Sequence, residues 1–232
     1  MAVLLIGGTG ALGAGLQHSW SSVEFDQVYT ADKFGDPDFF VDALDEYSLS
    51  QLFGNIYNSE IQLSCVVNLV GKIENKPFYS VFEKPKVHDS SSWNSVISHN
   101  LFTAFLITRA YFEFCQRRKI KMNLIHFSSI SAQGNPGQVA YSVAKAGVET
   151  LVKTLAKELG PLGHRINCVA PGYIDVASTH TNMTIPALER VIRTTPLRKL
   201  GDVESIAAIL SALITSKFLN GQIIGVDGGL TI

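Results

Sequence analysis

The chain has 232 residues, a formal net charge of −1 at pH 7 and a hydrophobic fraction of 46%. That fraction is enough to build a full core, whereas a nearly neutral chain has no long-range field to steer nucleic acid or an anionic membrane surface. No apolar stretch reaches the roughly 18 uncharged residues that a membrane span needs. We therefore expect neither a nucleic acid nor a membrane as a partner.

Short apolar, β-rich runs alternate with longer helical segments along the whole chain. The expected strands are 3–6, 28–31, 39–41, 65–70, 123–127, 165–169 and 222–226, and the expected helices are 13–21, 48–57, 93–118, 141–159 and 203–215. Apolar strands that alternate with helices predict an α/β fold, with a doubly wound parallel sheet of about seven strands and helices on both faces. One such sheet uses the chain from end to end, so we expect a single domain over residues 1–232.

The cysteines and the first residues bear on the compartment. Cys65, Cys115 and Cys168 lie far apart, and none sits in a CxxC pair or beside a histidine at metal-ligand spacing. This favours buried small hydrophobes in a reducing compartment and predicts no metal site. The apolar start at residues 1–6 lacks the basic region of a signal peptide. We expect a cytoplasmic protein.

Two of the expected helices are apolar over more than one face. The segment 141–159 carries apolar residues almost all round, and 93–118 is similarly broad. A helix that packs on a sheet needs one apolar stripe, so a second one predicts a second partner. We expect a dimer or tetramer built through these helices. The polar, irregular segments 72–92 and 175–195 are expected to be loops, and 175–195 a lid over the site.

A glycine-rich turn follows the first strand. Its glycines, Gly7, Gly10 and Gly13, are spaced as GxxGxxG and a helix follows. Glycines let the backbone turn tightly and approach a pyrophosphate, whose charge then meets the positive end of the helix. Asp32 ends the second strand, where a carboxylate accepts hydrogen bonds from ribose hydroxyls and repels a 2′-phosphate. This favours NAD(H), with NADP(H) as the alternative because Lys33 offsets the repulsion.

The strongest local pattern is Tyr141-Ser-Val-Ala-Lys145. Residues four apart share a helix face, so the Lys145 ammonium lies near the Tyr141 phenol. A nearby positive charge lowers the pKa of a phenol and makes it a usable general acid or base. Ser128 and Ser129 end the preceding strand, where a hydroxyl can hold a substrate oxygen. Asn100, in the long helix, is placed to bind a water that carries protons from Lys145.

These pieces together resemble the short-chain dehydrogenase/reductase family, and the second half resembles its 3-oxoacyl-(acyl-carrier-protein) reductase branch. The matching stretches are Asn100-Leu101, Ser128 to Gly147, Arg165 to Gly172, Thr195 to Gly201 and Asn220 to Gly229, in the family's order. The resemblance implies a Rossmann-like fold that moves hydride between a nicotinamide and a carbonyl or secondary alcohol of a small molecule. It also implies a catalytic tetrad of Asn100, Ser128, Tyr141 and Lys145, with Ser129 as the alternative serine.

The resemblance further implies the cofactor contacts. They are Gly7, Thr9, Gly10, Ala11, Leu12, Asp32, Asp42, Ala43, Asn68, Gly71, Tyr141, Lys145, Pro171, Gly172 and Ile174. Asp42 would face the adenine, and the stretch Pro171-Gly172-Tyr173-Ile174 would lie along the nicotinamide. The chain departs from the branch at Ala11, at Asn68-Leu-Val-Gly71 and at Val176, which bears on cofactor affinity and choice.

Two other functions are weighed against this one. The GxxGxxG spacing is found in sugar-nucleotide epimerases and dehydratases, but these add a substrate domain of about 80 or more residues after the sheet. About 60 residues follow Pro171 here. A non-catalytic NAD(P)-sensing or scaffold protein has no need of a perturbed tyrosine, so an intact tetrad argues against it. We therefore expect an NAD(P)-dependent oxidoreductase.

Overall fold

The computed structural model describes residues 1–20, 25–82 and 87–230. The strands in this part of the chain are β1 (Ala2–Ile6), β2 (Gln27–Asp32), β3 (Phe39–Phe40), β4 (Leu63–Asn68), β5 (Asn123–Phe127), β6 (Arg165–Pro171) and β7 (Ile223–Val226). All six neighbouring pairs are parallel, and the order across the sheet is β3-β2-β1-β4-β5-β6-β7. The predicted seven-stranded, doubly wound sheet is confirmed.

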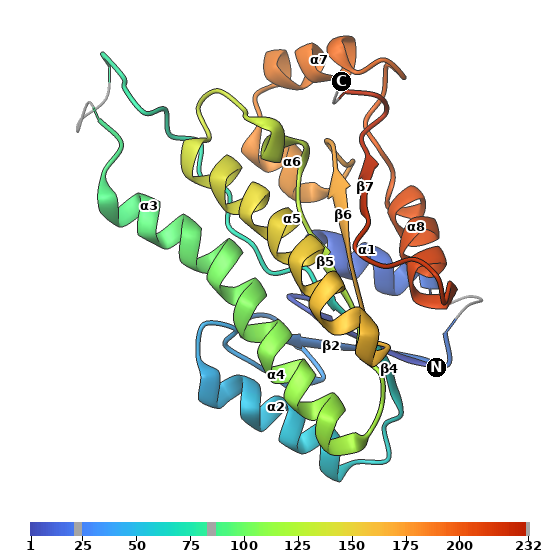
Figure 1. Ribbon diagram of the computed structural model, residues 1–232. Helices are drawn as coiled ribbons and strands as arrows, with labels where there is room; N and C mark the ends of the chain where they lie inside the picture. The colour runs from blue at the N-terminus through green and yellow to red at the C-terminus, as the bar shows by residue number, and fades with distance from the viewer. Residues whose placement is uncertain (21–24, 83–86, 231–232) are drawn as a thin grey trace.

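Helices cover both faces of the sheet (Figure 1). They are α1 (Ala11–Trp20), α2 (Glu46–Asn58), α3 (Ser90–Ile97), η1 (Ser98–Phe102), α4 (Thr103–Arg118), η2 (Ile130–Gln133), α5 (Val139–Leu159), η3 (Gly160–Leu162), α6 (Ala177–Asn182), α7 (Ile185–Thr194) and α8 (Val203–Thr215). One buried cluster joins α2, α4 and α5 to the sheet, and a second joins α1 and α8 to its other face. None of these helices is long and apolar enough to cross a bilayer, in the part of the chain that the structure describes.

Local chemistry fixes where several helices begin and end. Asp45 and Asp202 are N-caps whose carboxylates accept hydrogen bonds from the Tyr47 and Ser205 amides, as a capping residue must. Lys119 takes a left-handed backbone (φ 57°) directly after Arg118 and ends α4. All three cysteines are free and buried, as expected.

Two expectations about helices were wrong. Residues 93–118 lie in α3, a π-helical turn η1 and α4 rather than in one regular helix. Within η1, the side-chain Nδ2 of Asn100 donates to Val96 O at 2.8 Å. Residues 175–195 contain α6 and α7 where we expected irregular chain. In α7, polar residues separate the apolar ones and Pro186 lies in the first turn, where proline is tolerated. The predicted end of the first helix, at residue 21, lies outside the described residues.

The sheet order places the carboxyl ends of β1 and β4 side by side. From β1 the chain builds outward to β2 and β3, and then crosses back to start the other half at β4. At such a reversal the connecting loops diverge and leave a crevice beyond the strand ends. This edge of the sheet is therefore where a site is expected.

Candidate active site

Two cavities lie at this edge, and they share Leu69 and Gly71 of the loop after β4. The first, of about 240 Å³, is bordered by the ends of β1, β2 and β3 and includes Gly7, Gly10 and Asp32. The second, of about 390 Å³, lies at the ends of β5 and β6. Because they meet at one loop, the cavities form an elongated site with two unlike ends.

The glycine turn borders the first cavity and leaves no room for side chains at Gly7 and Gly13. Gly7 has a positive φ of 82°, and a Cβ there would lie 2.9 Å from Val70 N. A Cβ on Gly13 would lie 2.3 Å from Gly8 O, so α1 packs directly on the turn. The first turn of α1 contains no acidic residue. The close approach of the backbone at this turn and the positive helix end therefore fit a pyrophosphate.

Two carboxylates and one ammonium stand at the far end of the first cavity. Asp32 accepts hydrogen bonds from Thr9 Oγ1 (2.7 Å), from Thr9 N and from the amides of Lys33 and Phe34. Lys33 Nζ lies 3.2 Å from Asp42 Oδ2. The Leu44 amide, and then Lys33, hold the pKa of Asp42 below its usual value. Lys33 is thus engaged by Asp42, and Asp32 ties the glycine turn to β2.

A buried polar chain supports the loop that the cavities share. Asn68 Oδ1 accepts from Val70 N at 3.0 Å, and its Nδ2 lies 3.1 Å from His126 Nδ1. On the other side of the ring, His126 Nε2 lies 2.9 Å from Thr108 Oγ1. Burial lowers the pKa of His126 to about 3, so the imidazole is neutral. Asn68 therefore shapes the loop through its backbone contact, and its side chain does not line either cavity.

Tyr141 and Lys145 enter the second cavity from the first turns of α5. Lys145 Nζ lies 5.6 Å from the centroid of the Tyr141 ring and donates to Phe127 O at 2.8 Å. Burial lowers the pKa of Lys145 to about 8. The expected lowering of the phenol pKa is not found: burial raises the pKa of Tyr141, and a hydrogen bond with Ser129 opposes that rise. Desolvation of the phenolate outweighs the stabilising contact with Ser129.

The two serines after β5 point in different directions. Ser128 Oγ lies 2.8 Å from Glu149 Oε1 and 3.3 Å from Lys145 O, so its hydroxyl faces α5. Ser129 is the serine whose side chain reaches Tyr141. Its Oγ also accepts a hydrogen bond from Ser131 N, and this contact caps the start of η2. Both residues border the cavity, and of the two only Ser129 lies close enough to Tyr141 to lower the pKa of its phenol.

Asn100 acts through its neighbours rather than by lining the cavity. Its Nδ2 donates to Lys72 O (2.7 Å) and Val96 O (2.8 Å), and its Oδ1 accepts from Lys72 N. A Cβ added to Gly71 would lie 2.9 Å from Asn100 Oδ1 and 3.5 Å from Lys145 Nζ. Asn100, Gly71 and Lys145 are therefore stacked closely, with Gly71 between the amide and the ammonium.

Most of the residues predicted from sequence meet at the two cavities. Of the predicted residues, those that line neither cavity are Thr9, Ala11, Asn68 and Asn100. Several lining residues were missed by the sequence reasoning, namely Ile73, Asn75 and Gln138 in the second cavity and His99 and Thr103 in the first. Gln138 lies three residues before Tyr141, which was the one usable signal. In the described chain no group of three His, Cys, Asp or Glu side chains is placed to hold a metal ion.

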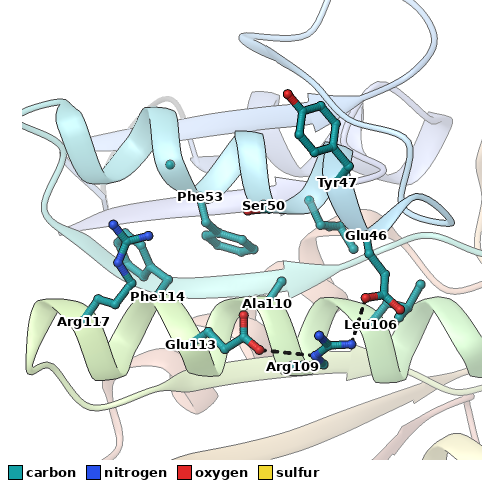
Figure 2. Close-up of a pocket in the computed structure, with 12 residues that line it drawn as sticks. Glu46, Tyr47, Ser50, Phe53, Leu106, Arg109, Ala110, Glu113, Phe114 and Arg117 are labelled. Atoms are coloured by element: carbon teal, nitrogen blue, oxygen red, sulfur yellow. Dashed lines mark hydrogen bonds and ion pairs between the residues drawn. The ribbon is translucent and has the colours of Figure 1, made fainter.

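A separate groove of about 320 Å³ lies between α2 and α4 (Figure 2). Arg109 reaches across it to Glu46 (2.8 Å) and binds Glu113 on its own helix (3.2 Å). Phe53 and Phe114 pack together at its floor, with ring centroids 5.5 Å apart. The groove contains none of the candidate catalytic residues, so we place the chemistry at the edge of the sheet.

Comparison with known proteins assigns the chain to a family. The family model described as enoyl-(acyl carrier protein) reductase matches residues 25–231. A 3-oxoacyl-(acyl-carrier-protein) reductase of Thermotoga maritima is 36% identical over 143 residues, which are 60% of this chain and 57% of that protein. The Aquifex aeolicus protein of the same name is 32% identical over 197 residues, covering 81% of this chain and 73% of the relative.

Solved structures share the fold. The structure of a Leptospira borgpetersenii short chain dehydrogenase with bound NAD+ has a TM-score of 0.83 and 24% sequence identity, and the match covers 100% of this chain and 92% of that one. At this identity the likeness speaks for the arrangement of helices and strands alone.

Proposed function

Because the chain belongs to the short-chain dehydrogenase/reductase family, we propose that it is a nicotinamide-dependent oxidoreductase of carbonyl compounds and secondary alcohols. The observation that carries this proposal is the meeting of Ser129, Tyr141 and Lys145 in the cavity that joins the glycine-rich one at Gly71. A site with a phosphate-binding turn at one end and a positioned phenol at the other suits a long cofactor that reacts at its far end.

The residues at both ends fit a dinucleotide. The glycine turn would hold the pyrophosphate, Asp32 the adenosine ribose, and Pro171, Gly172 and Ile174 the nicotinamide side. When bound, the cofactor supplies or accepts the hydride. The chain's own task is to orient the substrate carbon, to exclude water and to move one proton at the substrate oxygen.

Tyr141 is the proton donor in carbonyl reduction and the acceptor in alcohol oxidation. Since burial raises its pKa, the phenol stays protonated at neutral pH and is ready to act as an acid. Ser129 donates to the substrate oxygen, in place of Ser128, whose hydroxyl is held by Glu149. Lys145 carries its charge below a pH of about 8, because that is where burial sets its pKa. Asn100 is a positioning residue for the Lys72 backbone and Gly71.

Three finer assignments belong to the same proposal. NAD(H) is preferred, since Asp32 and Asp42 put two carboxylates in the adenosine cavity and Asp42 pairs with Lys33, the ammonium that would otherwise meet a 2′-phosphate. The chain assembles as a dimer or tetramer through α4 and α5, because Phe102, Phe105 and Val143 are each nearly half exposed. Its three buried free cysteines suit the cytoplasm.

Replacement of Tyr141 by phenylalanine tests the mechanism. Tyr141→Phe removes the transferable proton and keeps the ring, so turnover should fall by about 100- to 10,000-fold or more, as loss of a general acid does. NADH affinity, measured by fluorescence titration, should stay within about twofold because the hydroxyl alone is lost. Retention of more than about a tenth of wild-type turnover would contradict the role, and a non-catalytic, cofactor-sensing role would then fit better.

The two serines give a matched pair of variants. Ser129→Ala removes the hydroxyl that reaches Tyr141 and should lower kcat by about 100-fold or more. Ser128→Ala breaks the contact with Glu149 and should lower the melting temperature with a smaller effect on kcat. The opposite order of kcat losses would assign the substrate oxygen to Ser128.

A further inference from the structure

The connection between β4 and α3 carries an arm of exposed apolar residues. In the part of the chain that the structure describes, the arm consists of residues 77–82 and 87–88, and the two pieces meet in an antiparallel bridge between Tyr79 and Val87. The exposed apolar side chains of the arm are those of Phe78, Tyr79, Val81, Phe82 and Val87. Phe82 is 94% exposed. A surface cluster of this kind marks a place where another molecule binds.

The arm stands at one end of a long helical rod. α3, η1 and α4 follow one another with helical backbone angles at both junctions, so residues 90–118 form one rod (Figure 1). The arm extends beyond the first residue of the rod, Ser90. The groove between α2 and α4 lies beside the second half of the rod, around Phe114. The rod thus carries an apolar arm at one end and a groove toward the other.

The groove suits an aromatic occupant. Phe53 and Phe114 lie at its floor, and its volume of about 320 Å³ falls within the range of pockets that take up small ligands. The charged side chains that line it are two carboxylates and two guanidinium groups, those of Glu46, Glu113, Arg109 and Arg117. The groove therefore has no net charge that would select an ion. A guanidinium group packs well on an aromatic ring, so the groove matches the arm in chemistry.

A two-fold pair of rods brings the arm of one copy to the groove of the other. Phe102 and Phe105 stack on each other near the middle of the rod and are each 46% exposed, which makes this the crossing point for a second rod. Phe102 is twelve residues from Ser90 and twelve from Phe114. At about 1.5 Å per residue, each of these distances along the rod is about 18 Å. In an isologous pair whose rods cross antiparallel at Phe102, Ser90 of each copy therefore lies opposite Phe114 of the other. Arg109, in the groove lining, is seven residues after Phe102 and so shares its exposed face.

We infer that the groove between α2 and α4 binds the arm of a second copy of this chain, so that the two chains of a pair exchange arms. The inference goes beyond the oxidoreductase chemistry and rests on the proposed assembly through α4 and α5. It also links the assembly to the active site, because the arm continues from Ile73 and Asn75, which line the second cavity. Gln138 Nε2 donates to Asn75 Oδ1 at 2.7 Å. An arm fixed by the partner chain therefore holds this wall of the cavity from its other end.

Cysteines placed on different copies test the contact. Val81→Cys in the arm and Tyr47→Cys at the mouth of the groove are purified separately, mixed, allowed to exchange subunits and treated with a short bismaleimide, which joins two thiols. A covalent dimer should form in the mixture and in neither variant alone, because the two arms of a pair lie at opposite ends of the rods. The three native cysteines are buried and should not react. Phe218→Cys, 99% exposed after α8, is the control partner for Val81→Cys and should give no covalent dimer.

A matched pair of substitutions tests the groove. Gly54 lines the groove, and a Cβ added there has nothing within 4 Å. Gly54→Trp, introduced into the Tyr47→Cys copy, fills the groove and should abolish the covalent dimer with Val81→Cys. Gly54→Ala in the same copy leaves the groove open and should keep it. Equal yields from the two substitutions would place the arm elsewhere.

Substitutions in the arm test its share of the association. Phe78→Ser combined with Phe82→Ser should raise the dissociation constant of the dimer by at least about tenfold in light scattering, since two aromatic side chains lose their burial. Phe40→Ser, at a residue of β3 that is 70% exposed, removes an aromatic ring outside the arm and should leave the dissociation constant unchanged. Equal effects of the two changes would contradict a role of the arm.

The outcomes separate arm exchange from the assembly and from the chemistry. A dimer in light scattering that gives no covalent product from Val81→Cys and Tyr47→Cys, or that joins Phe218→Cys equally well, overturns arm exchange and leaves the assembly through α4 and α5 standing. A wild-type monomer overturns both. Turnover of the wild type is measured in parallel and bears on the oxidoreductase function alone.

Discussion

Acidification should destabilise the protein through His126, which is fully buried between Asn68 and Thr108. Asn68 Oδ1 accepts from Val70 N, so its Nδ2 donates to His126 Nδ1, and His126 Nε2 carries the proton that is shared with Thr108. A second proton on the ring would break the contact with Asn68. Burial, and then the positive charge of Lys145, lower the pKa of His126 to about 3 in the folded protein.

The size and sign of the effect follow from linkage. With a folded pKa of about 3 and an unfolded value near 6.5, only the unfolded chain takes up the proton between these pH values. The contribution of His126 to the free energy of unfolding is therefore complete above pH 6.5 and is lost as the pH falls toward 3. Between pH 7 and pH 5 the loss is about 2 kcal/mol. For a domain of this size that is about 4–8 °C in melting temperature.

The assay compares urea unfolding of the wild type and His126→Gln at both pH values. The variant is less stable at pH 7, but it lacks the titrating ring, so the difference between the two proteins should shrink by about 2 kcal/mol at pH 5. His164, whose pKa burial also lowers, is present in both and cancels. His18→Gln, at an exposed position of α1, should keep the wild-type slope. A difference that is the same at both pH values would refute the reasoning.

Three further predictions concern the cofactor cavity and the assembly. In fluorescence titrations the wild-type protein should bind NADH at least about tenfold more tightly than NADPH, because the carboxylate of Asp32 repels the 2′-phosphate. Asp32→Asn should reduce this ratio of affinities. Tighter binding of NADPH than of NADH by the wild type would contradict the prediction. Gly71→Ala should lower kcat/KM, and it should lower the free energy of unfolding by about 1–3 kcal/mol because the new methyl group overpacks against Asn100. Gly54→Ala has nothing within 4 Å of the new Cβ, so it should leave the melting temperature unchanged or raise it. Light scattering should give at least twice the chain mass, and Phe105→Glu should reduce it to the monomer; a wild-type monomer at micromolar concentration would refute assembly through α4 and α5.

Sequence alone predicted the elements that depend on local pattern. The expected strand at Asn123–Phe127 and helix at Val203–Thr215 agree with the structure to the residue. The glycine turn before α1 and the four-residue spacing of Tyr141 and Lys145 also follow from short stretches of chain. In each case neighbours in sequence supply the physics, because periodicity, glycine geometry and helix pitch act over a few residues.

Tertiary structure decided what depends on distant partners. Ser128 and Ser129 are adjacent in sequence, and only the packing of α5 against β5 turns one hydroxyl to Glu149 and the other to Tyr141. Asn75 lies 63 residues from Gln138, and the two meet because the loop after β4 pairs with the start of α5. The raised pKa of Tyr141 has the same origin: its phenol loses water to residues from several strand ends, and no spacing in the sequence measures that loss.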